Sequence, residues 1–307
     1  MTATATATPS SPLPLARVAA RKPAGAAVGI PPRQIDFRFP RDSKRYFFDD
    51  NGFSTLFFAT LSGFFPPGER FFMDSVRHYR DEISGERLKA CISGFMGQEA
   101  VHGREHERLN ELLSSRGIKV GMAERSVKRA LGVLRRFSPA QQLACTIFME
   151  HFTALFAEEL LSNQRFRDKV DPQLLHLWVW HALEELEHKA VAYDVYEQVS
   201  GSYAHRVMAV PLTAVALVPA IVASMVYLLN ADRELFNGAE NRRGFRLLFA
   251  KRGFIARFMP RMGEFLRRDF HPDDHNTDAL VKQWQEKLFG ENGSLLEEFR
   301  NREALMN

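Results

Sequence analysis

The sequence predicts an all-α protein built around a bundle of four long helices. Strand patterns are few, whereas apolar residues recur at helical spacing from about residue 53 to the C-terminus. Two of the helical segments begin with Ser138-Pro139 and Asp171-Pro172. Ser and Asp cap helix N-termini, and proline is favoured in the first turn, so these pairs mark helix starts. With 45% hydrophobic residues, a chain of 307 residues is able to bury a sizeable core.

The long helices are expected in a particular order along the chain. They are predicted at 68–82, 85–115, 138–163 and 171–200, and the last of them stops at Gly201. A shorter helix, 123–136, is expected in the connection between the second and third. A connection of about twenty residues suits a ferritin-like bundle, in which one crossover runs the length of the bundle.

Residues 1–35 are predicted to form a disordered basic tail. They are rich in Thr, Ala and Pro and contain no acid, and their four basic residues, which equal the formal net charge of +4, are Arg17, Arg21, Lys22 and Arg33. No apolar core of a secretory signal is present, although transit peptides share this basic composition. Residues 36–201 are assigned to the bundle and 202–307 to a C-terminal helical extension. Without a recognisable nucleic-acid-binding motif, no nucleic-acid partner is expected.

The extension begins with Val207–Asn230, a stretch of 24 residues without a charge that is long enough to cross a bilayer. The basic, aromatic segment 232–268 follows, with ten Lys or Arg against four acids. Three interpretations remain open: a membrane-spanning helix, peripheral contact of 207–268 with the inner face of the membrane, and a helix that packs internally or forms a homodimer. The two cysteines, Cys91 and Cys145, lack close partners, so a reducing, cytoplasmic location is expected.

Two of the predicted helices carry the same Glu-x-x-His motif. Glu99 and His102 form the first motif, and Glu185 and His188 form the second. Three-residue spacing places each pair on one face of its helix, where a carboxylate and an imidazole can bind the same metal ion. Single glutamates on the other two helices can bridge or cap a pair of ions. The candidates for this role are Glu69 and Glu150.

The surroundings of these motifs strengthen the prediction of a metal site. Glu150 lies in an otherwise apolar run, where burial of a bare carboxylate costs several kcal/mol unless a metal ion or an ion pair offsets it. His181 lies four residues before Glu185 on the same stripe, and is a further ligand candidate. His106, four residues after His102, is expected to orient a ligand from outside the metal's first sphere. Two flanking acids are expected to point away and to be solvated or paired with Arg and Lys: Glu184 and Glu187.

The stretch from Phe64 to His106 is similar to the bacterial family of predicted metal-dependent hydrolases. The similarity is carried by Phe-Pro-Pro-Gly-Glu-Arg-Phe-Phe at 65–72 and Gln-Glu-Ala-Val-His-Gly-Arg-Glu-His at 98–106. It continues through 180–188 to Phe-His-Pro at 270–272, leaving only the N-terminal tail outside.

The order of the candidate ligands also resembles that of the di-iron p-aminobenzoate N-oxygenases, whose pattern is Glu, Glu-x-x-His, Glu and His-x-x-x-Glu-x-x-His. In this sequence the pattern falls on Glu69, Glu99, His102, Glu150, His181, Glu185 and His188. This resemblance implies two metal ions and an extra histidine. It does not extend to the substrate, because little similarity lies outside the motif.

Carboxylates mixed with imidazoles suit iron, with manganese as the alternative. The sequence therefore predicts a di-iron protein that activates dioxygen and oxidises a hydrophobic or aromatic organic substrate with the help of an electron donor. Metal-dependent hydrolysis, in which a dinuclear site activates water, is the alternative. A non-catalytic metal-binding or storage role is the third hypothesis. The sequence contains no separate nucleophile motif or phosphate-binding loop that favours hydrolysis.

Overall fold

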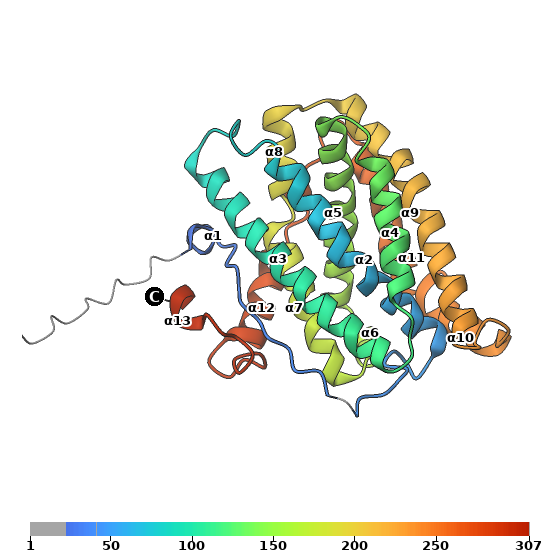
Figure 1. Ribbon diagram of the computed structural model, residues 1–307. Coiled ribbons are helices and arrows are strands. Elements are labelled where there is room, and N and C mark those ends of the chain that lie inside the picture. The colour runs from blue at the N-terminus through green and yellow to red at the C-terminus, as the bar shows by residue number, and fades with distance from the viewer. Residues whose placement is uncertain (1–22, 41, 307) are drawn as a thin grey trace, which may run out of the picture.

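The computed structural model describes residues 23–40 and 42–306 (Figure 1). The described residues are all-α, as predicted, with two isolated β-bridges and no named strand. The longer helices are α2 (Gly52–Arg77), α3 (Glu86–Ser115), α4 (Gly121–Leu134), α5 (Pro139–Ser162), α7 (Pro172–His188), α8 (Val191–Val199), α9 (Tyr203–Ala231), α10 (Gly238–Phe249) and α12 (Asp278–Phe289). The short ones are α1 (Ala24–Ala27), α6 (Gln164–Arg167), α11 (Phe254–Phe258), α13 (Arg302–Met306) and the 3₁₀ helices η1 (Met259–Leu266) and η2 (Pro272–Asp274).

The bundle consists of α2, α3, α5 and α7, with α8 continuing the course of α7. α2 packs along α3, and α5 packs along α7 and α8. α4 runs back beside α2 and α9 between the end of α3 and the start of α5 (Figure 1). Because α4 runs back along the bundle between them, α3 and α5 run in the same direction, as expected for a ferritin-like topology. This crossover lies in the long connection that the sequence predicts.

Two helix boundaries differ from the prediction. The first long helix begins at Gly52 rather than at residue 68, and Pro66 and Pro67 lie inside it. Pro66 lacks the N–H that would bond the carbonyl of Ser62 four residues earlier. This carbonyl instead accepts a hydrogen bond from Asn110 Nδ2 at 3.0 Å. The predicted fourth helix is interrupted by a turn after His188, and therefore consists of α7 and α8.

The N-terminal segment differs from the prediction of a disordered tail through residue 35. Residues 23–35 are packed against the bundle, and Ile30, Arg33 and Ile35 are buried. α1 approaches α3 so closely that a side chain at Gly25 would collide with the backbone of Gly94. The ordered part of the chain therefore begins well before residue 36, because apolar contacts and a buried charge hold this segment in place. Residues 1–22 lie outside the described residues.

The C-terminal extension shares the core of the bundle. α9 packs on α4 and α5, α10 and α11 pack on α2 and α5, and α12 packs on α7. Three of the six phenylalanines of the basic segment are buried core side chains, namely Phe254, Phe258 and Phe265. Among the described helices, α9 is the one that is long and apolar enough to cross a membrane, and about a third of its most apolar window is buried against the protein.

Candidate metal centre

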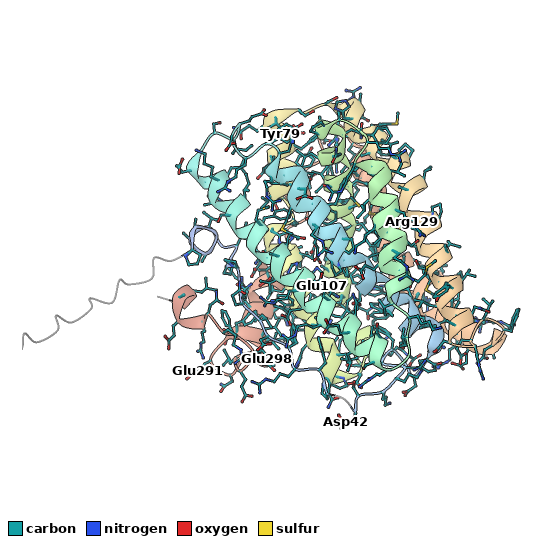
Figure 2. All side chains as sticks on the ribbon, in the orientation of Figure 1. Asp42, Tyr79, Glu107, Arg129, Glu291 and Glu298 are labelled. Carbon is teal, nitrogen blue, oxygen red and sulfur yellow. The ribbon has the colours of Figure 1, made fainter. Side chains whose placement is uncertain are left out.

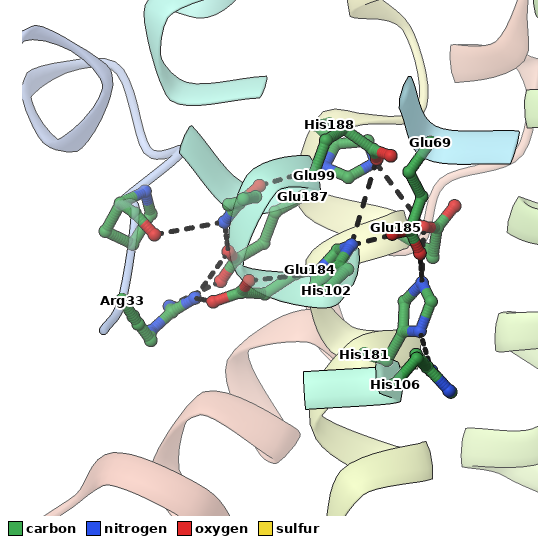
Figure 3. Close-up of polar contacts among 12 residues, drawn as sticks. Arg33, Glu69, Glu99, His102, His106, His181, Glu184, Glu185, Glu187 and His188 are labelled. Carbon is green, nitrogen blue, oxygen red and sulfur yellow. Dashed lines mark hydrogen bonds and ion pairs between the residues drawn. The ribbon is translucent and has the colours of Figure 1, made fainter. Parts of the chain in front are cut away.

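The predicted metal ligands lie inside the bundle on four different helices. No more than 4% of the surface of any of them is exposed. α2 contributes Glu69, α3 contributes Glu99 and His102, α5 contributes Glu150, and α7 contributes His181, Glu185 and His188. The helical spacing within each Glu-x-x-His motif turns both side chains toward the centre of the bundle, as Figure 3 shows.

Six of these side chains form two groups, in each of which the ligand atoms lie within 4.8 Å of one another: Glu69, His102 and His181, and Glu99, Glu185 and His188. Glu185 lies between the groups, because its Oε1 is 2.9 Å from His181 Nε2 and 3.7 Å from His188 Nε2. Glu150 lies beside the second group, with an oxygen 3.7 Å from His188 Nε2. The structure thus brings all seven candidates together.

The centre fits a pair of cations because its polar atoms lack other partners. Buried polar atoms in proteins are almost always hydrogen-bonded, so a cluster of exceptions requires an explanation. The atoms without a hydrogen-bond partner are both carboxylate oxygens of Glu69, Glu99 and Glu150, Glu185 Oε2, His102 Nδ1 and His188 Nε2. Four carboxylates would balance the charge of two divalent ions, and the oxygen and nitrogen donors suit iron, manganese or zinc.

Two of the histidines are oriented by hydrogen bonds from outside the cluster. His188 Nδ1 lies 2.9 Å from Gln98 Oε1, which leaves Nε2 facing the carboxylates. His102 Nε2 lies 3.0 Å from a carboxylate oxygen of Glu184, which leaves Nδ1 facing Glu185. Such outer partners fix which ring nitrogen is available to a metal and increase its basicity.

The third histidine is held by a chain of hydrogen bonds that begins at His106. His181 Nδ1 lies 2.8 Å from His106 Nε2, and His106 Nδ1 lies 2.9 Å from Ser62 Oγ. Ser62 in turn donates to Asn110 Oδ1 at 2.7 Å. The chain is satisfied when His181 and His106 each donate through Nδ1, so that His181 Nε2 is free to face Glu185. His106 therefore occupies the orienting position expected for it.

Arg33 links two of these outer partners from the N-terminal segment. Its guanidinium bonds Glu184 at 2.8 Å and Glu187 at 2.7 and 2.6 Å (Figure 3). Glu187 also accepts a hydrogen bond from Gln98 at 2.7 Å. Both glutamates are paired with an arginine as expected, but the expectation that Glu184 points away from the site is wrong, because Glu184 is fully buried against His102. The roles of Gln98 and Arg33 are absent from the sequence-based prediction.

Comparison with known proteins places this centre in a family. A family model described as "predicted metal-dependent hydrolase" matches residues 31–276, which is most of the chain. The chain belongs to this family. The matched region contains all seven candidate ligands and Arg33, so the predicted metal-dependent hydrolases share the segment that carries the centre. No curated protein and no solved structure matches the chain.

In this member of the family, burial determines the protonation of the centre. Burial raises the pKa of Glu69 and Glu150 well above the usual range, and the neighbouring carboxylates raise it further. Burial likewise raises the pKa of Glu99 to about 7. Glu185 differs, because its contacts with His181 and His188 outweigh burial and hold its pKa well below the usual range. Without cations, the centre therefore retains protons on most of its carboxyl groups.

Metal binding is expected to release protons, because a carboxyl group must be deprotonated before it binds a cation. Glu69, Glu99 and Glu150 have raised pKa values, so they hold protons when the pH lies below those values. Metal affinity should therefore rise as the pH rises through about 7, the pKa of Glu99. Calorimetric titration in two buffers of different ionisation enthalpy measures the released protons. The variant Glu150→Gln should release fewer, and heats that do not depend on the buffer would contradict this expectation.

A small apolar cavity borders the centre between α2, α5 and α7. His181 and Glu185 form part of its wall, and aromatic rings form much of the rest, among them Phe65, Phe152, Phe156 and Trp178. The ring of Phe65 also packs on His181, with the ring centroids 4.6 Å apart. A cavity of this composition favours small apolar molecules over charged ones.

Proposed function

We propose that this member of the family is an enzyme with a dinuclear metal centre. The observation that carries the proposal is the group of unpartnered carboxylate and imidazole atoms buried together in the bundle. A purely structural polar cluster would satisfy its atoms with one another, whereas most of these carboxylate oxygens face a shared space without a hydrogen bond, and a close approach among them is that of His188 Nε2 to Glu99 Oε1 at 3.1 Å. Carboxylates and imidazoles are donors for iron, and iron is the metal that we expect.

The donor set and its surroundings favour oxidation of a hydrophobic or aromatic substrate by dioxygen. Two ferrous ions in this centre would supply the electrons and the binding positions that dioxygen needs. The chain contributes three oriented imidazoles, four charge-balancing carboxylates and an interior that excludes bulk water. The cavity beside His181 and Glu185 is apolar, as an entry for dioxygen would be. An external electron donor would return the centre to its reduced state.

Hydrolysis is the second candidate, and the family's description supports it. A dinuclear centre can lower the pKa of a bound water and stabilise the charge that develops on a carbonyl or phosphoryl oxygen.

The two reactions can be separated with one protein preparation. The metal-free chain is loaded with ferrous iron without oxygen, and oxygen consumption and the absorption spectrum are then followed after air is admitted. We expect oxygen uptake that requires both iron and Glu185, and none from protein loaded with zinc. Ester hydrolysis by the zinc-loaded protein, together with no oxygen uptake by the iron-loaded protein, would instead identify a hydrolase. Binding of many more than two iron atoms per chain would indicate storage.

A further inference from the structure

The outward face of α9 is an apolar stripe without a partner in the chain. The opposite face of the helix is buried against the protein, and includes Ala209, Thr213, Met225 and Leu228. The outward side chains recur at three- and four-residue intervals, which is the period of one helix face. Their exposed fractions are 75% for Val215, 54% for Val218, 55% for Val222 and 49% for Val226. We call this stripe the α9 face.

Exposed apolar side chains continue the α9 face on both sides. Val133 on α4 is 48% exposed and Phe137 in the turn after α4 is 40% exposed, and a surface groove lined by these residues and by Val215 runs between α4 and α9. Beyond the end of α9, Phe236 is 91% exposed. Single exposed apolar residues are ordinary, but a continuous patch of this kind usually marks an interaction surface.

Positive charge surrounds the α9 face. α9 contains no acid, and Figure 2 labels Arg129 on α4, the helix beside it. The exposed basic residues of α4 and its end are Arg125, Lys128, Arg129, Arg135 and Arg136, and the acid within α4 is Glu124. At the other end of α9, basic residues outnumber the acids Asp232, Glu234 and Glu240, and the exposed ones on α10 and the following turn are Arg242, Arg243, Arg246, Lys251 and Arg252. An apolar face with a cationic border complements an anionic lipid surface.

We propose that the α9 face docks the protein on the surface of an anionic lipid bilayer, with α9 lying parallel to the membrane plane. Its apolar side chains would enter the boundary between headgroups and acyl chains, and the arginines and lysines beside it would contact anionic headgroups. The proposal does not depend on the reaction at the metal centre.

Two other placements of α9, across the bilayer or against a second copy of the chain, fit the structure less well. If α9 crossed the bilayer, α4 would enter the hydrocarbon with it, because the two helices pack along each other and α4 carries several exposed charges. If a second copy covered the α9 face, a symmetric contact would bring the cationic borders of two chains close together, and like charges repel. A bilayer with anionic headgroups avoids both costs.

Vesicle flotation with the full chain tests the proposal, using vesicles of phosphatidylcholine alone and of phosphatidylcholine mixed with phosphatidylglycerol. Val215→Glu places one charge in the centre of the α9 face, and Ser294→Glu adds the same charge at an exposed site in the segment between α12 and α13. Glu291 and Glu298 of that segment lie away from α9 in Figure 2. Phe236→Ser is a second variant, at a side chain so exposed that folding should not depend on it.

We expect binding to the anionic vesicles and little to the neutral ones, with binding weakened by salt. Val215→Glu should reduce binding about tenfold, and Phe236→Ser should reduce it as well, whereas Ser294→Glu should leave it unchanged. The proposal is overturned if the unmodified chain stays with the buffer, if it binds neutral vesicles equally well, or if Val215→Glu binds anionic vesicles as well as the unmodified chain does. A dimer in solution that Val215→Glu dissociates would also overturn it, in favour of a second copy of the chain.

Discussion

Replacement of Glu185 by alanine is expected to remove both metal ions from the purified protein. Glu185 Oε1 lies within 3.7 Å of a nitrogen of each of three histidines, His102, His181 and His188, and therefore belongs to both halves of the centre. Loss of an outer hydrogen-bonding partner already weakens metal binding by about 10- to 100-fold, and loss of a shared ligand should weaken it more. Metal analysis of the purified variant measures the effect.

Substitution of the neighbouring ligands, one at a time, tests the same site by metal analysis. Glu150→Ala and His188→Ala each alter the second group, and both should lower the metal content from two ions per chain. Glu158→Ala is the matched control, because Glu158 lies on the same helix as Glu150 but pairs with Arg261 outside the centre. Retention of two ions by Glu185→Ala would show that the cluster is not the metal site.

The clustering of the seven candidates could be predicted from the sequence because it depends on local spacing. Three residues separate Glu99 from His102 and Glu185 from His188, so each motif presents two donors on one helix face whatever the remainder of the fold. Glu150 could be recognised because a carboxylate in an apolar run needs a buried partner. These arguments require only a helix and an apolar interior, and the structure provides both.

The outer partners could not be predicted because they depend on which helix faces are buried. Glu184 lies next to Glu185 in the sequence, about 100° around the helix, so helical geometry predicts that it points away from the site and is solvated or paired with Arg or Lys. In the structure α7 is buried on several sides, so this face contacts His102 and Arg33 instead of water. Helical periodicity predicts the direction of a side chain, but not what occupies the space beyond it.

The N-terminal segment illustrates the same difficulty over a longer distance. Its composition is basic and rich in small residues, which is typical of disorder. The carboxylates that bind Arg33 lie more than 150 residues away in the chain, so no local pattern indicates the ion pair. Composition describes the average residue of a segment, whereas one buried arginine with two partners is enough to hold residues 23–35 in place.

Replacement of Arg33 by methionine is expected to lower the free energy of unfolding by about 3 to 5 kcal/mol, as is typical when one partner of a buried ion pair is removed. Arg33 is 5% exposed, and its removal leaves the buried carboxylates of Glu184 and Glu187 without their cation. Denaturant unfolding of the metal-free protein measures this cost apart from any effect on metal binding. The same variant should also bind metal less tightly, because Glu184 and Gln98 would orient His102 and His188 less firmly.

A matched substitution separates this role from the general loss of an arginine. Arg300→Met removes a cation from an exposed ion pair with Asp36, and should cost no more than about 1 kcal/mol. Adding Glu184→Gln and Glu187→Gln to Arg33→Met should recover much of the lost stability, because neutral amides need no buried cation. If Arg33→Met unfolds like the unmodified protein, the segment is a loosely attached tail after all, and the orientation of His102 and His188 does not depend on it. We expect instead that Arg33→Met lowers both stability and metal affinity, and that the added glutamine substitutions restore only the stability. This outcome would establish that the N-terminal segment supports the metal centre.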